Sequence, residues 1–146
     1  MTDVVNMLIR MAQNNAWATA RLHGRISDMD AVTFAAPRPG FFGSLKATLN
    51  HIHQVDLYYI DALEQGGAGR AVFAEAEHGD VTTLAAAQAE TDARLIHFCT
   101  ALTSETLRET RQTARRGGPV AETVGALLPP LFPHQVHHRG PAHVMV

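Results

Sequence analysis

Histidine is the residue type in this sequence best suited to do chemistry, and its spacing is the first feature to consider. The chain has nine histidines, three of which lie within residues 134–138. If this segment is helical, His134 and His138 are about 40° apart around the helix axis and about 6 Å apart along it. Two imidazoles in that arrangement can converge on one metal ion, and imidazole is the commonest side-chain metal ligand. His137 lies about 60° from His134, so it could take part in such a pair or face away.

A third ligand would have to come from another helix, as happens where a metal lies in the core of a helix bundle. The candidates are His51 and His53, which are about 200° apart around a helix and therefore cannot serve the same site. Measured against the apolar stripe of that segment, the helical wheel mildly favours His53. The spacing of the remaining histidines places none of them beside another candidate ligand. They are expected at the surface or at helix ends: His23, His78, His97 and His143.

Asp56 falls in the middle of the same apolar stripe. An ionised carboxylate is costly there unless it is paired or hydrogen-bonded. We interpret Asp56 as a buried partner of an arginine, a tyrosine hydroxyl or a helix end. The alternative is a role at the metal site, as a ligand or as a group that orients the ligating imidazoles.

The periodicity of apolar residues predicts the elements that must hold these side chains. Steps of three, four and seven predict helices over residues 4–22, 44–65 and 82–101, the second of them capped by Ser44. Residues 24–43 are predicted as a connection and residues 66–80 as a long loop, while residues 107–124 contain a turn and are compatible with a small hairpin. The last helix should begin near Pro130 or Pro133, because proline fits the first turn of a helix. Four helical segments with little strand predict an all-α bundle.

Length and composition limit the classes of protein to consider. The chain has 146 residues, which predicts a single domain over 1–146, and its net charge of −2 without a basic stretch argues against a nucleic-acid partner. The single Cys99 excludes an internal disulfide framework and is expected to pack in the core. No apolar run approaches about 20 residues and no export signal is recognisable, so we expect a cytoplasmic protein without a membrane partner.

Three segments resemble the motifs of a known family. Residues 41–44 (Phe-Phe-Gly-Ser), followed by residues 48–52 (Thr-Leu-Asn-His-Ile) and by Asp56, resemble the second-helix signature of the DinB family. Residues 131–140 resemble the last-helix motif of that family, and residues 15–18 (Asn-Ala-Trp-Ala) are similar to its first-helix motif. Together these segments spread over essentially the whole chain.

The resemblance implies an up-down-down-up four-helix bundle, often a homodimer, with a divalent metal held by three histidines at one end. On that pattern His51 matches the second-helix ligand, and His134 and His138 match the last-helix pair. The family pattern therefore overrules the preference of the helical wheel for His53. Asp56 and His137 would then lie behind the ligands as orienting groups. Better understood relatives are thiol-dependent transferases, isomerases and hydrolases, and they are not known to bind nucleic acid.

Two hypotheses follow for the function. The first is a metal-dependent enzyme of the hydrolase or thiol-dependent transferase type, with Zn²⁺ or Ni²⁺ as the metal and a low-molecular-weight thiol as a candidate cofactor. The alternative is a degenerate, non-catalytic scaffold or dimeric interaction module, which is suggested by three prolines at positions where the family often has other residues: Pro130, Pro133 and Pro141. Pro141 removes a helix hydrogen bond at a cost of about 3 kcal/mol and predicts a kink after His138.

Overall fold

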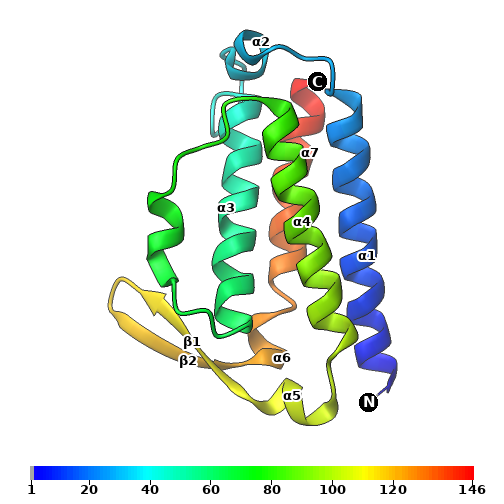
Figure 1. Cartoon of the computed structure of the whole chain (residues 1–146), viewed down its shortest axis with the longest axis vertical. Helices are drawn as coiled ribbons and strands as arrows, with labels where there is room; N and C mark the ends of the chain where they lie inside the picture. The colour runs from blue at the N-terminus through cyan, green and yellow to red at the C-terminus, as the bar shows by residue number, and fades with distance from the viewer. Residues whose placement is uncertain (1) are drawn as a thin grey trace.

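Four long helices dominate the computed structural model, which describes residues 2–146. They are α1 (Thr2–Arg25), α3 (Leu45–Leu63), α4 (Val81–Thr100) and α7 (Leu131–Met145). Helices α1 and α3 each pack against both α4 and α7, so the four enclose a shared core. In Figure 1, α1 and α7 begin at the end of the molecule where the N-terminus lies, whereas α3 and α4 end there. The chain is thus mostly helical, as the sequence predicted.

Short elements fill the connections between the long helices. The predicted connection over residues 24–43 contains the helix α2 (Ala31–Ala35), and the predicted loop over residues 66–80 contains the 3₁₀ helix η1 (Gly69–Ala74). Both corrections have the same reason, since segments of five or six residues are too short to display a helical period. Two further short helices, α5 (Ser104–Arg108) and α6 (Val124–Leu127), flank the strands.

Residues 107–124, whose sequence was compatible with a small hairpin, do form one. Strands β1 (Thr110–Arg115) and β2 (Gly118–Thr123) pair antiparallel, with Thr113 opposite Val120. Two side-chain hydrogen bonds hold this hairpin to α3. The Arg111 guanidinium donates to the carbonyl of Leu63 at 2.7 Å, and the Tyr58 hydroxyl donates to the carbonyl of Ala114.

Polar side chains at the helix starts explain where several helices begin. Ser44 is extended (φ −157°, ψ 161°) and its hydroxyl accepts the Ala47 amide at 3.0 Å, which fixes the first turn of α3. Asp80 accepts the Thr83 amide at 2.8 Å in the same way at the start of α4. Each such cap contributes about 1 kcal/mol. Helix α7 begins directly after Pro130, as predicted, and continues through Pro141 to Met145.

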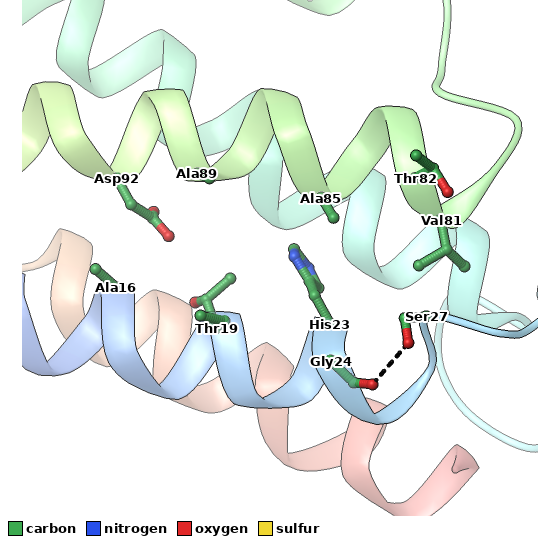
Figure 2. A pocket seen from close by; sticks show the side chains of 11 residues that line it. Ala16, Thr19, His23, Gly24, Ser27, Val81, Thr82, Ala85, Ala89 and Asp92 are labelled. Carbon is green, nitrogen blue, oxygen red and sulfur yellow. Dashed lines mark hydrogen bonds between the residues drawn. The ribbon is translucent and has the colours of Figure 1, made fainter.

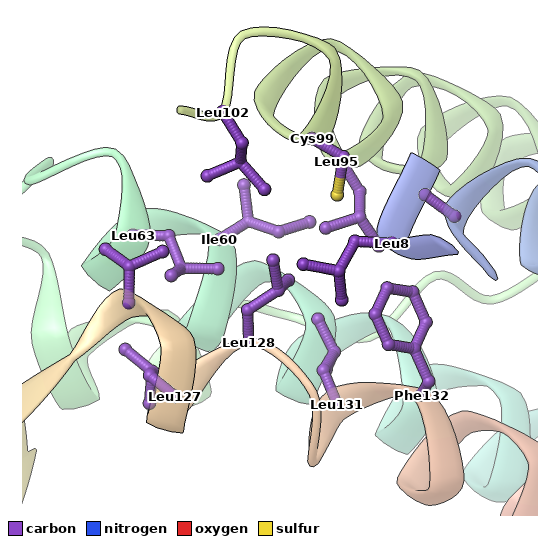
Figure 3. Packing of buried hydrophobic residues seen from close by; sticks show 12 residues of the cluster. Leu8, Ile60, Leu63, Leu95, Cys99, Leu102, Leu127, Leu128, Leu131 and Phe132 are labelled. Carbon is purple, nitrogen blue, oxygen red and sulfur yellow. The ribbon is translucent and has the colours of Figure 1, made fainter. Parts of the chain in front are cut away.

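The core consists of two apolar clusters with a polar layer between them. One cluster, shown in Figure 3, lies near the N-terminal end of α1 and includes Cys99, which is buried among leucines as expected. The other lies around α2 and the first turns of α3 and α4. Between them, each long helix contributes buried polar residues at the same level, namely Asn15 and Thr19, Asp56, Gln88 and Asp92, and Gln135 and Arg139. We call these seven residues the polar layer.

Candidate metal centre

Three histidines converge where α3 packs against α7. His51 of α3 and His134 and His138 of α7 each offer a ring nitrogen, and these three atoms all lie within 4.8 Å of one another. The Nε2 atoms of His51 and His134 are 3.3 Å apart. Within residues 2–146 this is the one group of three or more histidine, cysteine, aspartate or glutamate side chains whose candidate ligand atoms come so close. We call it the histidine cluster.

The helices position the cluster in a simple way. The Ser44 cap starts α3 two turns before His51, and Pro130 starts α7 one turn before His134. His134 and His138 then lie on one face of α7, and their ring centroids are 4.5 Å apart. Because α3 packs along α7, the His51 ring meets both, with ring centroids 5.2 Å from His134 and 4.7 Å from His138.

Phe42 covers part of the histidine cluster, a contact that sequence reasoning missed. Its ring stacks on His51 with centroids 4.4 Å apart and lies 5.4 Å from the ring of His138. The positive φ of Gly43, 79°, suits glycine and turns the chain between Phe42 and the start of α3. The motif at residues 41–44 was the available signal, since it places an aromatic residue just before the helix that carries His51.

The three imidazoles are held in the neutral form. Burial and, to a smaller extent, the neighbouring His138 and His51 lower the pKa of His134 to about 4. Burial also lowers the pKa values of His51 and His138 below their ordinary value. Neutral imidazoles at pH 7 have a free electron pair on one ring nitrogen, which is the form that binds a metal ion.

The geometry of the donor set fits a transition metal. Zinc–nitrogen bonds of about 2.0–2.1 Å at a tetrahedral angle separate two ligand nitrogens by about 3.3 Å. The His51 and His134 nitrogens are separated by 3.3 Å, and all three candidate ligand atoms lie within 4.8 Å of one another. In the described residues the Nδ1 atom of His134 is buried without a hydrogen-bond partner. Both ring nitrogens of His134 are therefore uncommitted to any protein group outside the cluster.

The other candidate histidines lie elsewhere. The Nε2 atom of His53 is 3.2 Å from the Thr91 hydroxyl on α4, and its ring packs edge-on against His78. His137 is exposed and stands beside the cluster, with its ring centroid 4.8 Å from that of His138. His97 and His143 are exposed as expected.

His23 lies at a helix end, which was one of the two positions expected for it, but it is buried rather than at the surface. It lies in the last turn of α1 but is only 8% exposed, and burial lowers its pKa to about 4. It lines a cavity of about 530 Å³, which Asp92 and several alanines also line. Figure 2 shows the His23 ring pointing from α1 towards α4. None of the three residues of the histidine cluster lines this cavity.

Asp56 belongs to the polar layer and accepts hydrogen bonds from two glutamines. The amide of Gln88 donates to it at 2.9 Å and the amide of Gln135 at 3.0 Å. These partners differ from the arginine, tyrosine hydroxyl or helix end that we expected from the sequence. Complete burial and, to a smaller extent, the charge of Asp92 raise the pKa of Asp56 to about 7 against the opposing effects of the two amides and of Arg139. Within residues 2–146, no hydrogen bond joins Asp56 directly to the histidine cluster.

Two cavities reach the histidine cluster. One of about 270 Å³ is mainly apolar and is lined by His138 together with Phe42, Pro141 and Met145. Another of about 420 Å³ has His134 in its wall and carries several arginines. The cluster is therefore accessible to small molecules from these cavities.

Comparison with known proteins agrees with the motifs. A family model described as DinB family matches residues 1–146, the whole chain. A search of curated proteins finds none that matches.

Of the helices in residues 2–146, none combines the length and apolar content that crossing a lipid bilayer would take.

Proposed function

The chain belongs to the DinB family, and from this premise we propose that it is a divalent-metal-dependent enzyme whose ligands are His51, His134 and His138. The observation that carries the proposal is the approach of their three candidate ligand atoms to within 4.8 Å. The lowered pKa values of all three imidazoles support it, because neutral rings can bind a metal at neutral pH.

The number of ligands favours catalysis over a purely structural metal. Structural zinc sites are closed by four protein ligands, whereas catalytic sites use three and leave one position open. Zn²⁺ or Ni²⁺ suits an imidazole set, and such an ion would supply a Lewis-acid centre that activates a bound water or a thiol. The chain's own contribution is to hold three neutral rings together, with Phe42 packed on two of them to keep water from one side. We therefore propose hydrolysis or thiol-dependent transfer as the reaction class.

We also propose an architecture and an assembly for the chain. The directions of α1, α3, α4 and α7 support an up-down-down-up four-helix bundle, and the continuous contacts among these helices support a single domain over 1–146. A homodimer remains a prediction from the family resemblance, which sedimentation of the purified chain would test.

Metal analysis tests the ligand set. Purified protein incubated with Zn²⁺ and then desalted should hold about one ion per chain, and His138→Ala should lose it. His143→Ala is the matched control, because His143 is exposed on the same helix and lies outside the cluster. Metal-free wild type, or equal metal in His138→Ala and wild type, would contradict the proposal.

Activity measurements separate a catalytic metal from a structural one. The zinc-loaded and nickel-loaded proteins should be assayed with ester and amide substrates, and with electrophiles in the presence of low-molecular-weight thiols. We expect turnover in at least one of these classes that His138→Ala abolishes and His143→Ala retains. A loaded wild type that turns over none of them would support the alternative of a non-catalytic scaffold.

A further inference from the structure

The cavity of about 420 Å³ beside His134 is positively charged. Arg70, Arg115 and Arg116 line it together with His134, and no aspartate or glutamate among residues 2–146 does so. These are three of only 12 lysines and arginines in a chain whose net charge is −2. A local excess of positive charge in a cavity of this size raises the local concentration of small anions.

Two of the three arginines have no anionic partner. The Arg115 guanidinium forms an ion pair with Glu122 at 3.3 Å. Arg70 instead lies over the ring of Phe73, 5.8 Å from its centroid. In the described part of the chain neither Arg70 nor Arg116 forms an ion pair. The charge of one arginine is therefore balanced within the protein, while two remain available to a ligand.

The hairpin that carries Arg115 and Arg116 is anchored rather than loosely attached. The bond from the Tyr58 hydroxyl to the Ala114 carbonyl fixes the strand immediately before Arg115. The Arg115 Nε atom also donates to the Thr113 hydroxyl at 3.1 Å, which limits the directions that its guanidinium can take. The anchored strand also fixes the backbone from which Arg116 extends, so less chain freedom is lost when an anion binds.

We propose that this cavity binds the carboxylate or phosphate group of the substrate and holds the rest of that molecule beside the histidine cluster. The inference rests on the proposed function, since it names the substrate class of the same site. Arginine suits the role because its planar guanidinium can donate two parallel hydrogen bonds to a carboxylate or phosphate. Tyr58, Tyr59 and Phe73 also line the cavity, so the preferred substrate is a small organic anion with an aromatic or apolar body.

A matched pair of probes tests the charge requirement. Full-length protein treated with a chelator is titrated with 3-phenylpropionate and with its neutral counterpart 3-phenylpropionamide at low ionic strength, and binding is followed by protein-observed NMR. Removing the metal ensures that the carboxylate is not binding to an ion. We expect the carboxylate to bind at least tenfold more tightly than the amide, and this preference to decline as salt is added. Equal affinities would overturn the proposal.

Arginine variants locate the binding. Arg70→Gln and Arg116→Gln should each weaken 3-phenylpropionate binding by about tenfold, whereas Arg25→Gln, an exposed site at the end of α1, should not. All three variants should retain the zinc content of the wild type. If Arg70→Gln and Arg116→Gln bind the probe as tightly as Arg25→Gln does, the anion site is wrong even when zinc binds. If probe binding depends on the two arginines but wild type holds no zinc, the proposed function fails while the anion site stands.

Discussion

Replacing Asp56 with asparagine should make the protein more stable above neutral pH. Asp56 is fully buried, and its pKa is raised from 3.8 to about 7, mainly by burial. Its two hydrogen-bond donors, Gln88 and Gln135, are uncharged amides. An asparagine side-chain carbonyl can also accept a hydrogen bond from such an amide. In the described residues, the buried Oε1 atom of Gln135 has no partner. Rotation of the Gln135 amide would bring that oxygen to the new asparagine NH₂ group.

The magnitude follows from the pKa shift. Because the folded pKa of Asp56 lies above the unfolded one, the folded state binds the proton more tightly. Its contribution to stability is complete below the unfolded pKa and is lost as pH rises from about 4 through 7. A rise of about three pKa units at about 1.4 kcal/mol each gives about 4 kcal/mol, of which about 3 kcal/mol falls between pH 5 and pH 8.

The assay is urea unfolding of wild type and Asp56→Asn at pH 5, 6, 7 and 8 in the presence of a chelator. Histidines with lowered pKa values contribute a pH dependence of the opposite sign in both proteins, so they cancel in the difference between the two curves, which reports Asp56 together with its coupling to Asp92. We expect the advantage of the variant to grow by about 3 kcal/mol from pH 5 to pH 8, and Asp28→Asn, at an exposed position, to show no such trend. A difference curve that is flat over this range would refute the reasoning.

Three further predictions concern the cluster and the core. Phe42→Ala should weaken zinc binding, measured by competition with a chelator, by about tenfold because it removes the ring stacked on His51. Phe41→Ala should leave this affinity unchanged, because the Phe41 side chain is 93% exposed. Pro141→Ala should raise the free energy of unfolding by about 1–3 kcal/mol, because it restores an amide that can donate to the His137 carbonyl, and a lower melting temperature for this variant would contradict the argument. Leu131→Ala should lower the free energy of unfolding, measured by urea denaturation, by about 2–5 kcal/mol because Leu131 is 0% exposed. Val136→Ala should change this free energy by less than about 0.5 kcal/mol, because Val136 is 59% exposed.

The sequence predicted the long helices because their periodic signals extend over many residues, whereas the weak alternation over residues 107–124 was only compatible with the hairpin. The helical wheel mildly favoured His53, whereas the residue that joins the cluster is His51, because a wheel orders residues around one helix without saying which neighbour covers each face. In the structure, α7 packs on the face that carries His51, while His53 meets Thr91 of α4. The motif resemblance supplied that missing relation between two helices.

The polar layer escaped prediction for a related reason. Asp56 was recognisable as a polar residue within an apolar stripe, but its partners lie on two other helices. Gln88 and Gln135 are 32 and 79 residues away along the chain. Only the relative heights of the helices bring their amides to one carboxyl group, and amphipathic periodicity carries no information about those heights.

The polar layer and the histidine cluster are linked through α7. Gln135 follows His134, and Arg139 follows His138, so the cluster and the layer use neighbouring residues that point about 100° apart around this helix. Gln135 donates to Asp56 on α3, and Arg139 donates to Asn15 on α1. These two bonds fix the rotation of α7 about its own axis, and that rotation determines whether the His134 ring reaches His51. We therefore propose that Asp56 positions the cluster through Gln135 and the orientation of α7, although it contacts none of the three histidines by a hydrogen bond within residues 2–146.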